Sequence, residues 1–127
     1  MKESKYSYKK LEAYKETKTL VKQVYALLKK FPKEEQYALC DQLRRAVISV
    51  PSNMAEGSGR TSAKDQAHFF EIAFGSLMEI ECQLDIACDL GYISNEELES
   101  LNAQIARVAA MLSGMRRKLL GENSLTR

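Results

Sequence analysis

The side chains of this sequence that could carry out chemistry are few and scattered. His68 is the only histidine, and it precedes Glu71 in a His-x-x-Glu spacing. A di-iron helical bundle needs Glu-x-x-His motifs from two helices, so this single reversed copy does not make such a centre. No serine or cysteine nucleophile stands in a recognisable turn that would pair with His68. We therefore expect no enzymatic activity, no catalytic residue, no metal and no cofactor.

The three cysteines, Cys40, Cys82 and Cys88, also suggest no site. Their odd number and the absence of a C-x-x-C spacing argue against a disulfide framework and against a thiolate zinc site. We expect them to be small buried apolar side chains. The charged amino terminus lacks a secretory signal, and no apolar run reaches the ~20 residues of a membrane span. A cytoplasmic location follows as the expectation.

The segment "GSGRTSAK", residues 57–64, has the glycines of a phosphate-binding loop before a helix start. It lacks the preceding strand and the G-K-[ST] order that nucleotide binding requires. We interpret Gly57 and Gly59 as the end of one helix and Ser62 as the N-cap of the next. An adventitious anion site beside Arg60 and Lys64 is the weaker alternative.

Charge is distributed unevenly along a chain whose formal net charge is only +2. Residues 1–30 carry nine lysines against three acids, whereas residues 61–90 carry one lysine against six acids. At 100° per residue, four lysines of the basic segment fall within an arc of about 60° and form a stripe about 21 Å long. These lysines are Lys15, Lys18, Lys22 and Lys29.

A lysine stripe of this kind can neutralise the phosphates of a nucleic acid. Tyr6 and Tyr8 alternate with lysines just before it, and such a mixture can also stack on bases. The alternative is an ordinary solvated helix face. The lysine stripe is the candidate site for RNA or single-stranded DNA.

The spacing of apolar residues predicts the elements that position these side chains. Four segments repeat apolar residues every three or four positions, which is typical of helices packed lengthwise. We expect helices over approximately 9–31, 33–57, 62–90 and 94–120, with tails 1–8 and 121–127. Ser62 and Ser94, each followed three residues later by an acid, begin the last two helices. Short turns then predict a single all-α domain, 1–127, folded as an antiparallel up-down four-helix bundle.

The predicted third helix carries a second apolar row on a different face from its main stripe. The row consists of Ala63, Ala67, Phe74, Met78 and Cys82, and its last three members are the candidate interface residues. One small bundle has little room to cover two apolar faces, so we expect an interface between copies of this chain. The alternative is a deeply buried helix.

Pro51 lies within the predicted second helix, where it removes a hydrogen bond to the Val47 carbonyl and should kink the helix. A polar row on the same helix, which includes Arg45 and Ser49, faces a comparable row on the third helix with Ser76 and Glu79. Arg45 in one row and Glu79 in the other have opposite charges, and we expect the two rows to pair across an interface. Solvated faces are the alternative.

Residues 44–65, together with "FFEIAFGSLMEIECQLDIACDLGY", resemble the 23S rRNA intervening-sequence protein family of four-helix-bundle proteins. The resemblance covers roughly residues 10 to 120, and Met54 stands where isoleucine is expected. The matching positions are Arg44, Arg45, Ser49, Pro51, Asn53, Glu56, Gly57, Gly59, Arg60, Ser62, Lys64, Asp65, either Phe69 or Phe70, Gly75, Ser76, Glu79 and Gln83.

The resemblance implies a four-helix protomer that assembles as a ring-like homopentamer. Some members are encoded inside insertions of large-subunit rRNA genes, and a related protein is a basic accessory to a retroelement reverse transcriptase. The family offers no catalytic residues to carry over. We therefore expect a non-enzymatic homo-oligomer that binds RNA or single-stranded DNA through its lysines. The alternative is a protein-interaction scaffold that recruits another protein and binds no nucleic acid.

Overall fold

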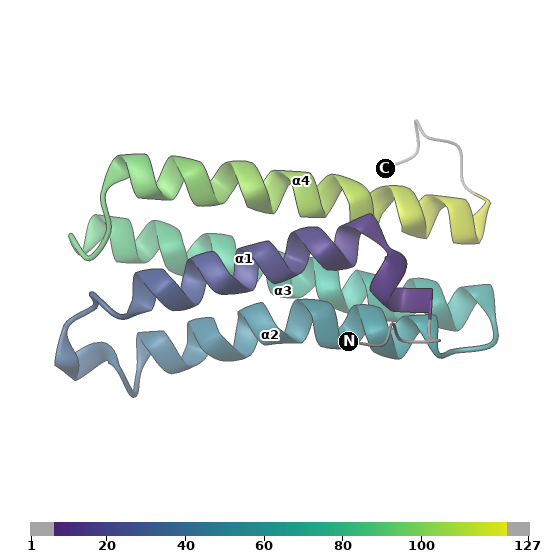
Figure 1. Ribbon diagram of the computed structural model, residues 1–127, viewed down its shortest axis with the longest axis horizontal. Helices are drawn as coiled ribbons and strands as arrows, with labels where there is room; N and C mark the ends of the chain where they lie inside the picture. The colour runs from purple at the N-terminus through teal and green to yellow at the C-terminus, as the bar shows by residue number, and fades with distance from the viewer. Residues whose placement is uncertain (1–6, 122–127) are drawn as a thin grey trace.

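The computed structural model describes residues 7–121 and contains only helices and turns over that range. The long helices are α1 (Glu12–Leu28), α2 (Leu39–Ser58), α3 (Ala63–Asp89) and α4 (Asn95–Leu120). Two short 3-10 helices, η1 (Ser7–Lys10) and η2 (Lys33–Glu35), precede α1 and α2. The long helices lie lengthwise beside one another (Figure 1). The all-α fold with four helices is confirmed for the described residues.

Each long helix buries one apolar stripe in a shared core. Leu20 of α1, Leu43 of α2 and Leu77 of α3 are fully buried, and Ile105 of α4 is 1% exposed. Burial of apolar surface contributes about 25 cal/mol per Å², so these stripes are the main force that holds the helices together. Thr17 is a polar exception in the core, and its hydroxyl donates to the Ala13 carbonyl at 2.6 Å.

Serine side chains begin the last two helices, as the sequence predicts. The Ser62 hydroxyl accepts a hydrogen bond from the Asp65 backbone N–H. At α4 the capping box is complete: the Ser94 hydroxyl accepts from the Glu97 N–H at 3.1 Å, and the Glu97 carboxylate accepts from the Ser94 N–H at 2.9 Å. These bonds satisfy backbone donors that the first turn leaves unpaired.

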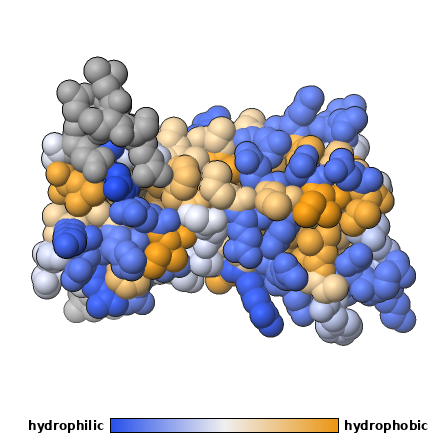
Figure 2. Space-filling view, turned by 180° about the vertical axis from the view of Figure 1, so that it is seen from behind, coloured by the Kyte–Doolittle hydropathy of each residue, from blue (hydrophilic) through white to orange (hydrophobic). Residues whose placement is uncertain are grey.

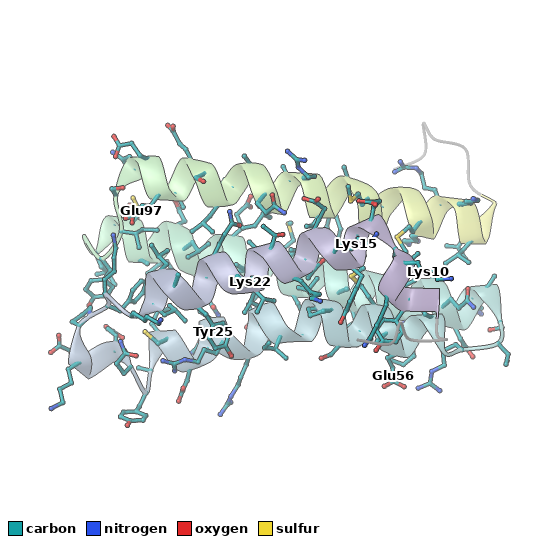
Figure 3. All side chains as sticks on the ribbon, in the orientation of Figure 1. Lys10, Lys15, Lys22, Tyr25, Glu56 and Glu97 are labelled. Atoms are coloured by element: carbon teal, nitrogen blue, oxygen red, sulfur yellow. The ribbon has the colours of Figure 1, made fainter. Side chains whose placement is uncertain are left out.

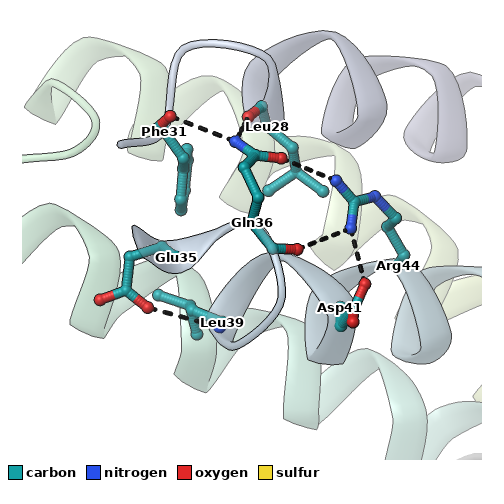
Figure 4. Close-up of polar contacts among 7 residues, drawn as sticks. All are labelled: Leu28, Phe31, Glu35, Gln36, Leu39, Asp41 and Arg44. Carbon is teal, nitrogen blue, oxygen red and sulfur yellow. Dashed lines mark hydrogen bonds and ion pairs between the residues drawn. The ribbon is translucent and has the colours of Figure 1, made fainter. Parts of the chain in front are cut away.

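The first two helices are shorter than the sequence analysis predicts. Instead of helices over 9–31 and 33–57, α1 begins at Glu12 after η1 and ends at Leu28, and α2 begins only at Leu39. The Gln36 side-chain amide donates to the Leu28 and Phe31 carbonyls at 3.0 and 3.2 Å, respectively (Figure 4). Gln36 therefore caps the end of α1 from within the connection, which folds back instead of extending α2.

Two ion pairs join neighbouring helices near their ends (Figure 1). Lys30, just after α1, pairs with Glu97 at the start of α4. Arg116 near the end of α4 pairs with Glu71 near the start of α3 at 2.9 Å. Helix α1 packs against both α2 and α4 and lies between them in Figure 1, and its remaining face is turned outward.

Candidate nucleic-acid interface

The outward face of α1 carries the lysine stripe. Lys15, Lys18 and Lys22 lie within α1, Lys29 is its C-cap residue, and all four side chains are exposed. Figure 3 shows Lys15 and Lys22 along the face of α1 that is turned toward the viewer. Residues 7–33 hold eight lysines against two glutamates. The described structure therefore places the lysine stripe on an exposed face of α1, within a segment that carries a strong excess of positive charge.

The lysines of the stripe differ in the contacts that their ammonium groups make within the protein. Lys15 Nζ lies 3.7 Å from Glu12 Oε1, an exposed pair that the sequence analysis did not anticipate. Lys18 Nζ lies 5.6 Å from the centroid of the Tyr14 ring. Within residues 7–121, no ion pair joins Lys18, Lys22 or Lys29 to a carboxylate. These three lysines have the charge most available to a ligand.

Acidic side chains on the α4 side mark one edge of the stripe. Glu16 accepts from Gln104 at 2.9 Å and lies 3.8 Å from Arg107 Nε, both on α4. Glu97 accepts a hydrogen bond from Lys30, and this bond holds the pKa of the Glu97 carboxyl below its ordinary value. The glutamates of this edge are therefore engaged between α1 and α4.

Of the two tyrosines expected to stack on bases, Tyr8 alone lies within the described residues, and its ring is engaged inside the protein. Tyr6 lies outside the described residues. Tyr8 packs edge-on against Tyr14, with the ring centroids 5.1 Å apart. The Tyr8 ring is thus used within the protein, at the junction of η1 and α1.

Arg44 organises the connection between α1 and α2. Its guanidinium donates to the Gln36 carbonyl at 3.1 Å, to Gln36 Oε1 at 2.9 Å and to Asp41 Oδ1 at 2.7 Å (Figure 4). Because Gln36 in turn caps α1, Arg44 stabilises two helix ends at once. Its position in the motif has a structural explanation.

The polar rows of α2 and α3 do meet, but through residues other than the predicted charge pair. The Ser49 and Ser76 hydroxyls lie 2.9 Å apart, and Gln83 Nε2 donates to Gln42 Oε1 at 3.3 Å. Arg45 and Glu79 form no ion pair with each other within residues 7–121, and both side chains are exposed. Neutral groups suit this half-buried seam because desolvating a charge costs more than desolvating a hydroxyl or amide.

Two further motif residues lie beside Ser49 in α2. Asn53 Nδ2 donates to the Ser49 carbonyl at 2.8 Å and to the Ser49 hydroxyl at 3.0 Å. Pro51 lies inside the helix, which continues to Ser58. The kink at Pro51 stays a prediction.

The glycine-rich segment is a tight junction between α2 and α3. A Cβ at Gly57 would lie only 3.0 Å from Phe69 Cβ, so this glycine permits close helix packing. Gly59 is the C-cap residue of α2. Arg60 pairs with Glu56 at 2.8 Å, and its guanidinium carbon lies 4.6 Å from the centroid of the Phe69 ring. The segment ends one helix and begins the next, as we expected.

The predicted oligomer interface is exposed only in part. Phe74 is half-buried against the core, whereas Met78 is 36% exposed and Cys82 is exposed. Figure 2, which views the face behind α1, shows hydrophobic areas that interrupt the hydrophilic surface. Other large exposed apolar side chains of the α3 segment are Ile72, Ile86 and Leu90.

The cysteines have three different environments. Cys40 is buried, and this burial raises the pKa of its thiol. Cys88 is half-buried and its Sγ donates to Asn95 Oδ1 at 3.2 Å. Cys82 is exposed, so the expectation of burial was wrong there, because its position on α3 faces away from the core.

Residues 7–121 present neither a metal-binding cluster nor a membrane span. In this range no three His, Cys, Asp or Glu side chains gather closely enough to hold a metal ion. No helix within the same range has both the length and the apolar composition of a membrane span.

Comparisons with known proteins identify both the fold and the family. A crystal structure of a protein of unknown function from the S23 ribosomal protein family of Bacteroides thetaiotaomicron superposes with a TM-score of 0.74. It is 19% identical and covers 83% of this chain and 98% of its own, a likeness that shows the fold. No curated protein matches the sequence. The sequence pattern of the 23S rRNA-intervening sequence proteins matches residues 9–114, and the chain belongs to that family.

Proposed function

We propose that this protein is a non-enzymatic, oligomeric bundle that binds RNA or single-stranded DNA through the lysine stripe of α1. The observation that carries the proposal is the excess of positive charge around α1. Residues 7–33 contain eight lysines and only two glutamates. Lys18, Lys22 and Lys29 are exposed and have no carboxylate partner within the described residues. Such lysines bind phosphates without reading the base sequence.

Assembly would strengthen this binding. We propose that the antiparallel up-down bundle is the protomer of a ring-like homopentamer, as the family resemblance implies, with Met78 and Cys82 in the contact between copies. Several copies of the stripe in one particle raise the local electrostatic potential and allow multivalent contact with a long strand. Binding that is weak for a single stripe then becomes strong for the assembled particle.

A second candidate function is a protein-interaction scaffold. The apolar residues that remain exposed on α2 and α3, among them Ile48, Ile72 and Ile86, favour it. Apolar side chains of this kind contribute to protein contacts and do not bind phosphates. The scaffold predicts no salt-dependent binding of nucleic acid.

A charge-reversal experiment tests the proposal. The test variant changes Lys18, Lys22 and Lys29 to Glu, and the matched control makes the same change at Arg45, Lys64 and Lys118, which are also exposed. Binding of a fluorescent single-stranded RNA is followed by anisotropy over a range of salt concentrations. If three lysines contact phosphates, the wild-type log-log slope includes about −2 from them.

The two variants have the same net charge, so a difference in RNA binding between them reports where the changed residues lie and not the total charge of the protein. We expect the stripe variant to lose binding and the control variant to retain most of it. Both should melt close to the wild type, because exposed substitutions usually change stability by less than about 0.5 kcal/mol each. A folded wild-type protein that binds no RNA at low salt would favour the scaffold, and equal losses in both variants would refute a localised site.

A further inference from the structure

Tyr25 is an aromatic side chain on the same face of α1 as the lysine stripe. Its side chain is 39% exposed although tyrosine is large and partly apolar. Within residues 7–121, its hydroxyl has no hydrogen-bond partner and its ring packs against no other aromatic ring or cation. The bundle covers part of Tyr25, and the exposed part makes no hydrogen bond or ring contact within these residues. Tyr25 is therefore free to contact a ligand.

The helical position of Tyr25 places it among the available lysines. Lys22 precedes it by three residues and Lys29 follows it by four, and these spacings put side chains on one face of a helix. The rise per residue separates Tyr25 from these lysines by about 4.5 and 6 Å along the axis. Figure 3 labels Lys22 and Tyr25 on neighbouring turns of α1, with Tyr25 toward α2.

The other described tyrosines are less suited to contact a bound strand. Tyr8 and Tyr14 pack against each other, and Tyr92 donates to Glu35 at 2.9 Å. Tyr37 is 90% exposed, but it follows Glu34 and Glu35 in the connection between α1 and α2. Tyr25 alone among these rings combines exposure, a missing partner and lysines on both sides.

An aromatic ring between two ammonium groups is suited to one unpaired nucleotide. The ring can stack on the face of a base while the lysines contact the phosphates on either side. In a duplex the base faces are covered by neighbouring base pairs and cannot reach the ring. We infer that Tyr25 stacks on an unpaired base, so that the α1 surface selects single-stranded over double-stranded nucleic acid. This inference rests on the proposed function and adds a stacking contact to its phosphate contacts.

Substitutions at Tyr25 test the stacking contact separately from the charge. Tyr25→Leu removes the ring but keeps an apolar side chain, and Tyr25→Phe keeps the ring. The matched control is Tyr37→Leu, which removes an even more exposed ring outside the stripe. Each variant is titrated with a single strand of about 12 nucleotides, within the range of known site sizes, and with the duplex of the same sequence.

We expect Tyr25→Leu to weaken single-strand binding at least about fivefold and to leave duplex binding and the salt slope unchanged. Tyr25→Phe and Tyr37→Leu should bind the single strand like the wild type. Unchanged binding by Tyr25→Leu, alongside lost binding by the lysine variant, would overturn stacking but leave the phosphate contacts intact. Equal losses on single strand and duplex would also overturn the inference. A wild type that binds neither would refute both proposals.

A fluorescence measurement gives a second readout that does not depend on affinity. The chain contains no tryptophan, so Tyr25→Trp and Tyr37→Trp each introduce a single reporter. Stacking on a base should quench the reporter at position 25 when the single strand is added at saturation, and leave the reporter at position 37 unchanged. Equal responses at the two positions, or none at position 25, would refute direct stacking.

Discussion

The hydroxyl oxygens of Ser49 and Ser76 lie 2.9 Å apart and join α2 to α3 across a half-buried seam. Asn53 completes the group because its amide donates to both the carbonyl and the hydroxyl of Ser49. A polar group in such a seam stabilises the fold only when its members satisfy one another, since an unpaired buried donor or acceptor costs about 1–3 kcal/mol. The three side chains therefore act as a unit.

Removing one hydroxyl of this pair should destabilise the protein more than removing an exposed one. We expect Ser49→Ala to lower the free energy of unfolding by about 1–2 kcal/mol, because it leaves the Ser76 hydroxyl without this partner and removes one of the two bonds that the Asn53 amide makes to Ser49. Ser52→Ala, at an exposed position of α2, should change it by less than about 0.5 kcal/mol. Urea unfolding measures both. A double-mutant cycle with Ser76→Ala should give a coupling of at least about 0.5 kcal/mol, and strict additivity would contradict the contact.

Glycine-to-alanine substitutions should have opposite signs at Gly57 and Gly75. A Cβ at Gly57 would lie 3.0 Å from Phe69 Cβ and 3.1 Å from the Gln66 carbonyl oxygen, so α2 and α3 must separate. We expect a loss of about 1–3 kcal/mol there. Gly75 lies in α3 with open space around it, and alanine should stabilise that helix by about 0.5–1 kcal/mol. Thermal unfolding of both variants checks the prediction, and a stabilised Gly57→Ala would show that the junction is looser than described.

The adjacent arginines of α2 should differ in their contribution to stability. Arg44→Met removes three hydrogen bonds that fix the connection between α1 and α2, and we expect a loss of about 1–3 kcal/mol. Arg45→Met, at an exposed position, should cost less than about 0.5 kcal/mol. Equal urea midpoints for the two variants would show that the Arg44 contacts make no net contribution to the free energy of unfolding.

Local signals explain which features could be predicted from the sequence. The serine caps at Ser62 and Ser94 are formed by residues three positions apart, so the sequence alone indicates them. The lysine stripe follows from helical periodicity in the same way. The short start of α2 could not be predicted, because it depends on Gln36 reaching back to the Leu28 carbonyl and on Arg44 holding Gln36. Such contacts exist only once the connection has folded.

Candidate sites were harder to predict than the helices because exposure depends on packing. The neighbouring lysines favour Tyr6 and Tyr8 as rings that stack on bases, yet Tyr8 packs on Tyr14. Tyr25 was missed, although its spacing from Lys22 and Lys29 was visible in the sequence. The sequence does not give the exposed fraction of Tyr25, because this fraction depends on how α1 is oriented against α2 in the packed bundle.

Acidification should weaken the contact between Lys30 and Glu97. The hydrogen bond from Lys30 lowers the pKa of Glu97 below the ordinary value of 4.5, so the folded protein binds this proton less readily than the unfolded chain. The stabilisation is therefore present above pH 4.5 and is lost as the pH falls through the lower, folded-state pKa. We expect Lys30→Met to be less stable than the wild type at pH 7, and the difference to shrink toward about pH 3. Urea unfolding at both pH values measures it, and a difference that grows on acidification would contradict the assignment.

Assembly should depend on the exposed apolar side chains of α3. Met78 is 36% exposed on a helix whose main stripe is already buried, so its remaining apolar surface is available to another copy of the chain. Met78→Glu places a charge in that contact, and we expect native mass spectrometry to show a shift toward the protomer mass. Tyr37→Glu introduces the same charge at a 90% exposed residue outside α3 and should leave the assembly unchanged. Both variants should keep the wild-type circular dichroism, because neither side chain is buried in the core. A wild-type protein that is monomeric at micromolar concentration, or an intact Met78→Glu oligomer, would exclude this face as the interface.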